Sequence, residues 1–134
     1  MKTAVIYWSA TGNTEAMAKA VAEGVGVEAV SVSDFSGDIK EHDSLALGCP
    51  AMGDEVLEES EFEPFFASIE GKLSGKKVLL FGSYGWGDGQ WMRDWEERVK
   101  AAGAELFGGE GYIVNDAPAD DDVEKRTAIG KELA

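Results

Sequence analysis

The sequence predicts a doubly wound α/β domain of three layers, in which helices cover both faces of a five-stranded parallel sheet of order 2-1-3-4-5. Apolar runs of strand length alternate along the chain with stretches of helical spacing. Three of these runs are almost wholly apolar, which is typical of strands buried on both faces. Polar or glycine-rich loops follow the same three runs. Because parallel strands need right-handed crossovers, few topologies remain, and this order is favoured for five strands.

The strands of this sheet are expected at short apolar runs. Residues 4–8, 44–48 and 77–81 are the most apolar and form the first, third and fourth strands. Residues 27–32 form a short, more polar second strand, and the runs 105–107 and 112–114, which flank a glycine cluster, supply the fifth. The switch point of this order lies between the first and third strands, and open sheets bind ligands there, at the carboxyl ends of the strands.

Helices are expected between and after the strands. Their apolar stripes are Met17, Ala20 and Val21; Phe62, Phe65, Phe66, Ile69 and Leu73; Trp91, Trp95, Val99 and Ala102; and Ala128, Ile129 and Leu133. We expect Asp88 to cap the third of these helices. Residues 34–43 are too few for a full helix and should form a turn that tucks Phe35 and Ile39 inward.

Length and charge limit the function. The 134 residues fit one domain, spanning 1–134. The formal net charge of −14 argues against binding to nucleic acid or to an anionic membrane, and favours a partner with a basic surface. The alternative is an acidic surface that only keeps the protein in solution. Clustering favours the partner, because the acids between residues 54 and 63 have no basic residue among them, and a second group lies between 116 and 124.

Other residues exclude several chemistries. His42 is the only histidine, so neither a histidine-based metal site nor a Ser-His nucleophile is supported. Cys49 cannot form an internal disulfide and is expected to be a buried small residue; with no signal peptide or membrane-length apolar run, this favours the cytoplasm. A phospho-receiver site would need acids after the first and third strands, where Tyr7-Trp8 and residues 48–50 stand instead.

The loop Ser9–Thr14 between the first strand and the first helix is the strongest candidate site. A helix begins with unpartnered N–H groups and partial positive charge, and this loop adds three hydroxyls, the Asn13 amide and a flexible Gly12. It contains neither Gly-Lys-Ser/Thr nor G-x-G-x-x-G, which excludes a triphosphate loop and the dinucleotide fingerprint. Neutral donors suit one terminal monophosphate. An ordinary capped helix start explains the loop equally well on this evidence alone.

Two further loops end the third and fourth strands and should meet this one at the same sheet edge. In the loop 82–89, Trp86 stands among glycines and offers a stacking surface for a flat ligand, unless it anchors the loop to the body of the protein. In the loop 48–55, Met52 offers a polarisable side chain that packs on aromatic rings. A flat ring could lie between Met52 and Trp86 while its phosphate reaches the first loop.

These loops resemble those of the short-chain flavodoxins, the clostridial type most closely. The matching segments are Ser9-x-Thr11-Gly12-Asn13-Thr14-Glu15, Ala51-Met52-Gly53-Asp54-Glu55-Val56-Leu57-Glu58-Glu59 and Phe81-Gly82-Ser83-Tyr84-Gly85-Trp86-Gly87-Asp88-Gly89. With length and strand order, the resemblance covers nearly the whole chain and implies a flavodoxin-like fold. The switch-point placement of FMN in flavodoxin is a known example of this rule. Pro50 and Ala10 depart from the pattern of some relatives, which have Ser and Gly there.

The resemblance implies a monomeric, low-potential one-electron carrier with non-covalently bound FMN, cycling mainly between semiquinone and hydroquinone and meeting basic surfaces of redox enzymes. It places the phosphate on Ser9, Thr11, Asn13 and Thr14 with Ser83, and the ring between Met52 and Trp86. Glu55 would meet the pyrimidine edge, the Gly85 amide would lie near O2, and the Gly53-Asp54 peptide would flip on reduction. The whole cofactor-binding set is Ser9, Ala10, Thr11, Gly12, Asn13, Thr14, Pro50, Ala51, Met52, Gly53, Asp54, Glu55, Ser83, Tyr84, Gly85, Trp86, Gly87, Asp88 and Gly89.

Two alternatives to a carrier stay open. Flavin reductases acting on quinones share the fold and the phosphate loop, but they need an open pocket over the flavin, and the chain has no long insertion to build one. A monophosphate-binding regulatory module would need neither Trp86 nor Met52. We also expect the acids near the ring, among them Asp54, Glu55 and Glu58, to keep the second reduction potential low, because they disfavour an anionic reduced flavin.

Overall fold

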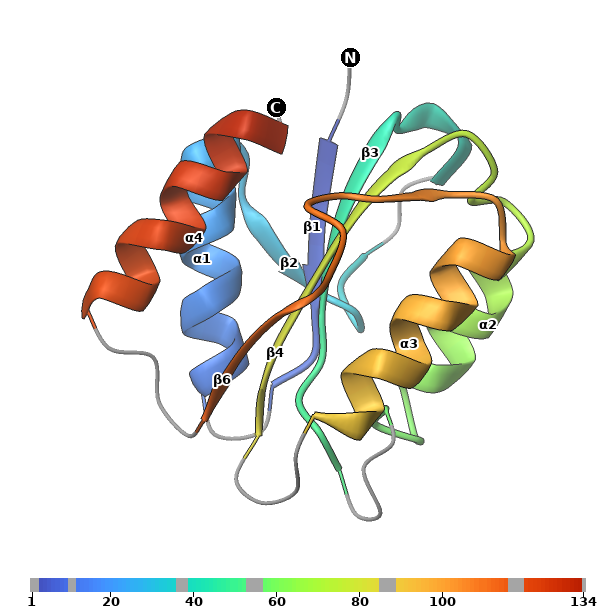
Figure 1. Cartoon of the computed structure of the whole chain (residues 1–134), viewed down its shortest axis with the longest axis horizontal. Helices are drawn as coiled ribbons and strands as arrows, with labels where there is room; N and C mark the ends of the chain where they lie inside the picture. The colour runs from blue at the N-terminus through green and yellow to red at the C-terminus, as the bar shows by residue number, and fades with distance from the viewer. Residues whose placement is uncertain are drawn as a thin grey trace.

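The computed structural model describes residues 3–9, 12–35, 39–52, 57–84, 89–115 and 120–133. They form a parallel sheet between two pairs of helices, as Figure 1 shows. The predicted three-layer architecture is therefore confirmed.

The sheet has the predicted order, β2-β1-β3-β4-β5, with β6 also paired to β4, and every pairing is parallel. Its strands are β1 (Thr3–Tyr7), β2 (Ala29–Ser31), β3 (Ser44–Gly48), β4 (Lys77–Tyr84), β5 (Glu105–Leu106) and β6 (Tyr112–Asn115). The register places Tyr7 beside Gly48 and Gly48 beside Phe81. The carboxyl ends of the three central strands therefore lie at one level, at the lower edge of Figure 1.

Helices cover both faces of the sheet. They are α1 (Asn13–Val25), α2 (Phe62–Glu70), α3 (Gln90–Ala101) and α4 (Asp120–Leu133), with a short 3-10 turn, η1, at Ile39–Glu41. Helices α1 and α4 pack on one face, and α2 and α3 on the other (Figure 1). None of the described helices is long and apolar enough to cross a membrane.

Alternate residues of β4 supply two separate cores. Val78 and Leu80 pack beneath α2 and α3, whereas Leu79 and Phe81 pack beneath α1. All four side chains are fully buried, as expected for a strand covered on both faces. Trp91 and Trp95 are each 1% exposed, which confirms that they are core residues, and Phe35 and Ile39 are tucked inward as predicted.

Several predicted details differ in the structure. The predicted second helix includes Leu73, but α2 ends at Glu70 and Leu73 is a buried residue between α2 and β4. The second strand is shorter than 27–32, because only residues 29–31 pair with β1 and Val27 and Glu28 are exposed. The fifth strand is divided: β5 pairs with the beginning of β4 and β6 with its end. The prediction that Asp88 caps α3 is wrong, because the N-cap is Gly89, whose φ of 91° is the left-handed conformation that glycine adopts most readily.

Candidate functional site

The three predicted loops begin side by side at the carboxyl edge of the sheet. Backbone pairing continues past the strands: the N–H of Trp8 donates to Gly48 O at 3.0 Å and that of Cys49 to Phe81 O at 3.1 Å. The N–H of Ala51 then donates to Ser83 O at 3.0 Å. These bonds confirm the convergence expected from the strand order, because each joins the start of one loop to its neighbour.

The N-terminus of α1 lies at this edge, and no side chain of the described residues caps it. Its N-cap is Gly12, with φ of 96°, and the first intrahelical bond runs from Ala16 N–H to Gly12 O at 2.9 Å. The Ser9 hydroxyl accepts the Gly12 N–H at 3.0 Å, which turns the loop back toward the helix. The N–H groups of the first turn, at residues 13–15, precede that bond and are oriented along the helix axis toward the edge. This is the backbone geometry of an anion site.

Two hydroxyls from distant segments meet beside this helix start. Thr14 Oγ1 of α1 and Ser83 Oγ of β4 are 3.1 Å apart, and either can donate to the other. Both residues are buried, with 1% and 6% of their surface exposed. Two hydroxyls carry two hydrogens, and their mutual bond uses one. The pair therefore retains one hydrogen that can be donated to a ligand.

The charge nearest to the helix start is partly compensated. Glu15, in the first turn of α1, accepts a hydrogen bond from the Tyr7 hydroxyl at 3.2 Å and pairs with Lys19 at 3.3 Å. Burial first, and then the neighbouring Glu15, raises the pKa of Tyr7 above its ordinary value. Since Lys19 and the Tyr7 hydroxyl engage this carboxylate, it repels an anion at the helix terminus less than a free carboxylate would.

The remaining described residues of the predicted set lie around the same edge. Asn13, Pro50, Ala51 and Met52 are half-buried, and so is Tyr84, whose ring lies 5.7 Å from that of Trp91. Ala10, Thr11, Gly53, Asp54, Glu55, Gly85, Trp86, Gly87 and Asp88 lie outside the described residues. Among the residues that the structure describes, no cluster of His, Cys, Asp and Glu could hold a metal ion.

One acid of the stretch 54–63, Glu58, is not the exposed charge that the sequence indicates. Glu58 is 5% exposed, and its carboxylate accepts the N–H groups of Ser60, Glu61 and Phe62 at the start of α2. Burial alone would raise the pKa of Glu58, but these backbone donors outweigh burial and lower it. The carboxylate is therefore ionised and committed to its own loop, so its expected contribution to the charge around a ligand is reduced.

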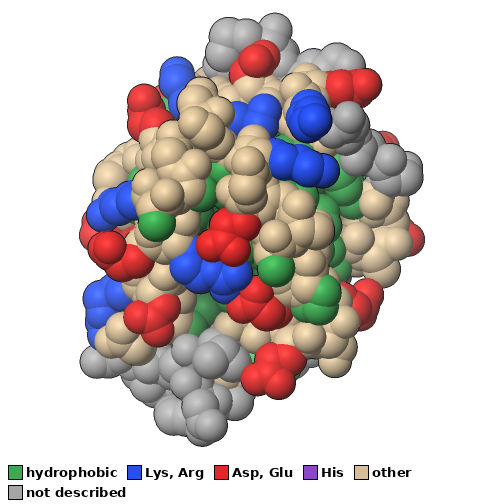
Figure 2. Space-filling model, turned by 90° about the vertical axis from the view of Figure 1, so that its right-hand side faces the viewer, with side chains coloured by type: hydrophobic (Ala, Val, Ile, Leu, Met, Phe, Trp, Pro, Cys, Tyr) green, Lys and Arg blue, Asp and Glu red, His purple; other side chains and the backbone are tan. Residues whose placement is uncertain are grey.

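Arg98 of α3 pairs with two acids of α2. Its guanidinium donates to Glu63 at 2.6 and 2.9 Å and to Glu70 at 3.0 and 3.1 Å, and it lies 4.8 Å from the centre of the Phe66 ring. These bonds raise the pKa of Arg98 above its ordinary value. Figure 2 shows acidic and basic side chains intermingled on this face of the molecule. The sequence does not reveal this pairing, because residues 63 and 98 are far apart along the chain.

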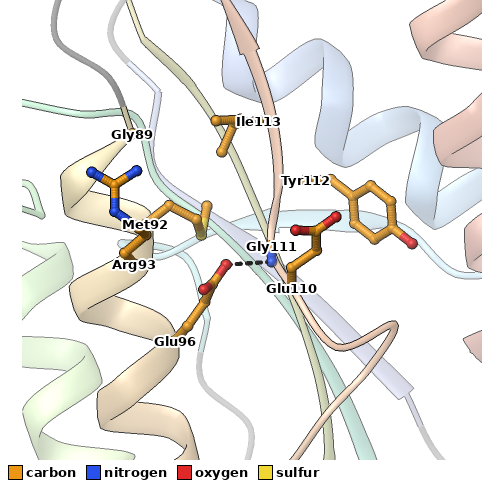
Figure 3. A pocket seen from close by; sticks show the side chains of 8 residues that line it. All are labelled: Gly89, Met92, Arg93, Glu96, Glu110, Gly111, Tyr112 and Ile113. Carbon is orange, nitrogen blue, oxygen red and sulfur yellow. Dashed lines mark hydrogen bonds between the residues drawn. The ribbon is translucent and has the colours of Figure 1, made fainter.

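A cavity between α3 and β6 was not anticipated from the sequence. It has a volume of about 420 Å³ and begins beside Gly89, where the fourth-strand loop ends (Figure 3). Glu96 closes part of its wall by accepting the Gly111 N–H at 2.7 Å. Its lining residues are Gly89, Met92, Arg93, Glu96, Glu110, Gly111, Tyr112 and Ile113. No alternation or motif marks these residues, since they come from one face of a helix and the outer edge of a strand.

Fold and site together define a doubly wound α/β protein with a helix N-terminus and two buried hydroxyls at its switch point. The model of the family described as Flavodoxin matches residues 5–130, and the chain belongs to the flavodoxin family. It is 59% identical over 105 residues to a flavodoxin of Clostridium beijerinckii, covering 74% of this chain and 76% of that one. It is 50% identical over 120 residues to a flavodoxin of Megasphaera elsdenii, covering 85% and 86%.

Solved structures agree with the family assignment. The solution structure of two-electron reduced Megasphaera elsdenii flavodoxin superposes with a TM-score of 0.84 at 40% identity, covering 98% of this chain and 99% of that one. The crystal structure of oxidised flavodoxin 1 from Bacillus cereus gives 0.85 at 29% identity, covering 99% and 97%. Flavodoxins are FMN-binding electron-transfer proteins rather than enzymes, and this chain is one of them.

The described residues fit the FMN of this family. A terminal monophosphate needs a compact set of donors, which the uncapped α1 terminus and the Thr14–Ser83 hydroxyl pair provide. Met52 lies one residue beyond the bond that joins Ala51 to Ser83, on the same edge as the cradle. A phosphate and a planar ring of one ligand therefore have donors and an apolar contact on a single edge of the sheet.

Proposed function

We propose that this flavodoxin is a low-potential carrier of single electrons, and that its FMN cycles mainly between half-reduced and fully reduced forms as it moves electrons between redox enzymes. The observation that carries the proposal is the meeting of the uncapped α1 terminus, the Thr14–Ser83 pair and the Met52 segment at one sheet edge. When bound, FMN supplies the one-electron chemistry. The protein residues bind it, orient it and set the charge around it.

The phosphate would be held by the first-turn N–H groups of α1 with Ser9, Thr11, Asn13 and Thr14, supported by Ser83. Buried neutral donors suit this role because the phosphate then keeps its charge and is bound by hydrogen bonds strengthened by that charge. No lysine or arginine lies between residues 9 and 14, so this loop leaves the charge of the phosphate uncompensated by a formal positive charge. That uncompensated charge disfavours adding a negative charge to the cofactor and so supports a low potential.

The ring would lie between Met52 and Trp86, with Glu55 and the Gly85 amide at its polar edge and the Gly53-Asp54 peptide beside it. Ala10, Gly12, Pro50, Ala51, Tyr84, Gly87, Asp88 and Gly89 complete the proposed binding set. Support comes from the family assignment and from the position of Met52; the other ring contacts remain expectations taken from the resemblance.

The same proposal includes the oligomeric state, the location and the partners of the protein. Residues 1–134 would act as one monomeric domain in the cytoplasm, and the net charge of −14 would attract redox partners through their basic surfaces. Exposed Glu59 and Glu61 supply such charge at the start of α2. Glu63 and Glu70 supply less of this charge, because both pair with Arg98, whose single positive charge offsets one of their two negative charges.

Anaerobic reductive titration of the FMN-loaded protein, followed by visible absorption, tests the proposal. The expected result is a yellow protein that turns blue at half reduction and then pale, because a one-electron carrier stabilises the half-reduced form. Direct bleaching without the blue form would contradict the proposal and favour a two-electron flavoenzyme. A colourless protein that takes up no added FMN would contradict the binding site itself.

A further inference from the structure

The chain segment that carries Met52 begins at Cys49, after β3, and ends at Glu58, before α2, and these two ends are bonded to each other. The N–H of Glu58 donates to Cys49 Sγ at 3.3 Å, and the thiol in turn donates to Pro50 O at 3.5 Å. Cys49 is fully buried and Glu58 is 5% exposed. The base of the segment is therefore a buried contact.

The side chain of Glu58 fixes this base to α2. Its two carboxylate oxygens accept the N–H groups of Ser60 at 2.6 Å, Glu61 at 2.9 Å and Phe62 at 3.0 Å. The first turn of α2 has no side-chain cap from its own N-cap residue, Glu61. Glu58 therefore satisfies donors that a helix start leaves open, and a buried carboxylate with three such donors holds a single position.

A third contact fixes the other side of the base to α3. The indole Nε1 of Trp91 donates to Cys49 O at 3.1 Å, and Trp91 is 1% exposed. Trp91 follows Gly89, where the fourth-strand loop joins α3. Cys49 is therefore tied to α2 through its thiol and Glu58, and to α3 through its carbonyl oxygen and Trp91.

We propose that Cys49, Glu58 and Trp91, here called the base clamp, position the Met52 segment against the flavin and thereby help to set the FMN affinity and the two reduction potentials. This inference rests on the proposed function, because it concerns the same flavin site. The clamp residues act through the segment and do not touch the cofactor. A segment with both ends fixed keeps Met52 in one position relative to the ring, whereas a loosened base lets Met52 shift.

The competing explanation is that Glu58 is only a helix cap. A cap contributes to the free energy of unfolding, but it does not change the relative stability of the reduced forms of a bound cofactor. Charge is a second confounding factor, since removing any nearby carboxylate favours an anionic reduced flavin. A useful test therefore compares two variants that each remove one negative charge, one at a clamp residue and one at a residue outside the clamp.

The test uses the FMN-loaded protein in three forms: wild type, Glu58→Gln and Glu59→Gln. Glu59 is adjacent and exposed, so its substitution makes the same charge change without touching the clamp. Both reduction potentials, the FMN dissociation constant and the free energy of unfolding are measured for each. We expect Glu58→Gln to weaken FMN binding by tenfold or more and to shift both potentials, while Glu59→Gln shifts only the second and binds FMN as tightly as wild type.

A tryptophan pair tests the clamp without a change of charge. Trp91→Phe removes the indole donor to Cys49 O but keeps a large aromatic ring, whereas the buried Trp95 Nε1 has no partner among the described residues. We expect Trp91→Phe to change the FMN dissociation constant by a factor at least three times larger than Trp95→Phe does. The shifts in the two potentials, converted to equilibrium constants, should differ between the variants by at least the same factor. This pair also decides the question if Glu58→Gln does not fold.

The outcomes separate the two proposals. The clamp would be overturned if each clamp variant and its control changed FMN binding and the potentials equally, and Glu58→Gln and Trp91→Phe differed from their controls only in lower stability. The carrier function would then stay intact. A wild-type protein that takes up no FMN, or that bleaches without a half-reduced form, would overturn the proposed function, and this inference with it. Larger effects from both clamp variants than from their controls would support the clamp.

Discussion

Gly24 of α1 and Gly130 of α4 lie directly against each other, so the backbones of the two helices are in contact at this point. A Cβ atom at Gly24 would overlap the carbonyl oxygen of Thr127, and one at Gly130 would overlap that of Val21. Both obstacles belong to helix backbones, which cannot rotate away as a side chain can. The seating of α4, and with it the carboxyl end of the described chain, therefore depends on two absent methyl groups.

Substituting either glycine should destabilise the protein. Gly24→Ala or Gly130→Ala must push the helices apart, and overpacking of this kind costs about 1 to 3 kcal/mol, more than the roughly 1 kcal/mol that alanine gains in helix propensity. Urea unfolding measures the change. Gly71→Ala is the matched control, because a Cβ there meets no atom within 4 Å, and a control variant as unstable as the other two would contradict the explanation.

The hydroxyl pair at the phosphate cradle should behave as a unit. Thr14→Val or Ser83→Ala alone leaves one hydroxyl free to donate, so each is expected to weaken FMN binding less than about fivefold. The double variant removes both donors and should weaken binding by more than the product of the single effects, a coupling of about 1 kcal/mol.

Fluorescence titration with FMN and with riboflavin checks the hydroxyl pair. Riboflavin lacks the phosphate, so its affinity should be the same in all four proteins. If the double variant loses affinity for riboflavin as strongly as for FMN, the pair supports the fold of the edge rather than the phosphate.

The Cys49 thiol should be inert in the native protein. Burial raises the pKa of Cys49 well above its ordinary value, although the N–H of Glu58 opposes the shift, so the thiol stays protonated. We expect a disulfide reagent to label the native protein slowly and the urea-unfolded protein rapidly. Rapid labelling of the native form would show that the base of the Met52 segment is open.

The same shift predicts a pH dependence of stability. Because the folded pKa of Cys49 is raised, its contribution to stability is complete below the unfolded pKa of about 8.5 and is lost as pH rises above it, by up to about 1.4 kcal/mol per pH unit. Wild type should therefore lose more stability between pH 8.5 and 10 than Cys49→Ala does. Parallel curves for the two proteins would contradict the buried-thiol assignment.

Exposed acids should lower the second reduction potential by an amount that falls as their distance from the flavin grows. Removing the charge of Glu59 is expected to raise the second potential by about 15 to 30 mV, for a separation of about 12 Å in an effective dielectric of about 40 to 80. Glu23→Gln is the control, because Glu23 lies near the far end of α1, about 15 Å along the helix from its start. Equal shifts in the two variants would show a general charge effect.

Much of the fold could be predicted because burial on both faces is evident in residue type. The β3 residues Leu45, Ala46 and Leu47 form an apolar run, and all are fully buried in a central strand. Helix starts were harder to predict: the N-cap of α3 is Gly89 rather than Asp88, because a left-handed backbone conformation precedes the helix. Composition does not reveal that conformation.

The candidate site could be located from the sequence, but its internal contacts could not. Strand order brings the three loops together, whereas the Thr14–Ser83 bond depends on how far α1 is shifted along β4. Glu58 looked like a member of a surface charge cluster, yet it is buried under α2 by bonds to its own loop. Contacts of this kind follow from packing between elements, which the hydrophobic pattern does not specify.

The divided fifth strand makes one region of this protein open to extension. Because β5 and β6 pair with the two ends of β4 independently, the stretch between them, with its left-handed and exposed Gly108 and Gly109, connects two separately paired strands at the surface. Loop closure becomes costlier only slowly with length, by about 0.6 kcal/mol per doubling. A foreign peptide could therefore be grafted at these glycines, giving an electron carrier that bears a tag or a second domain away from its cofactor edge.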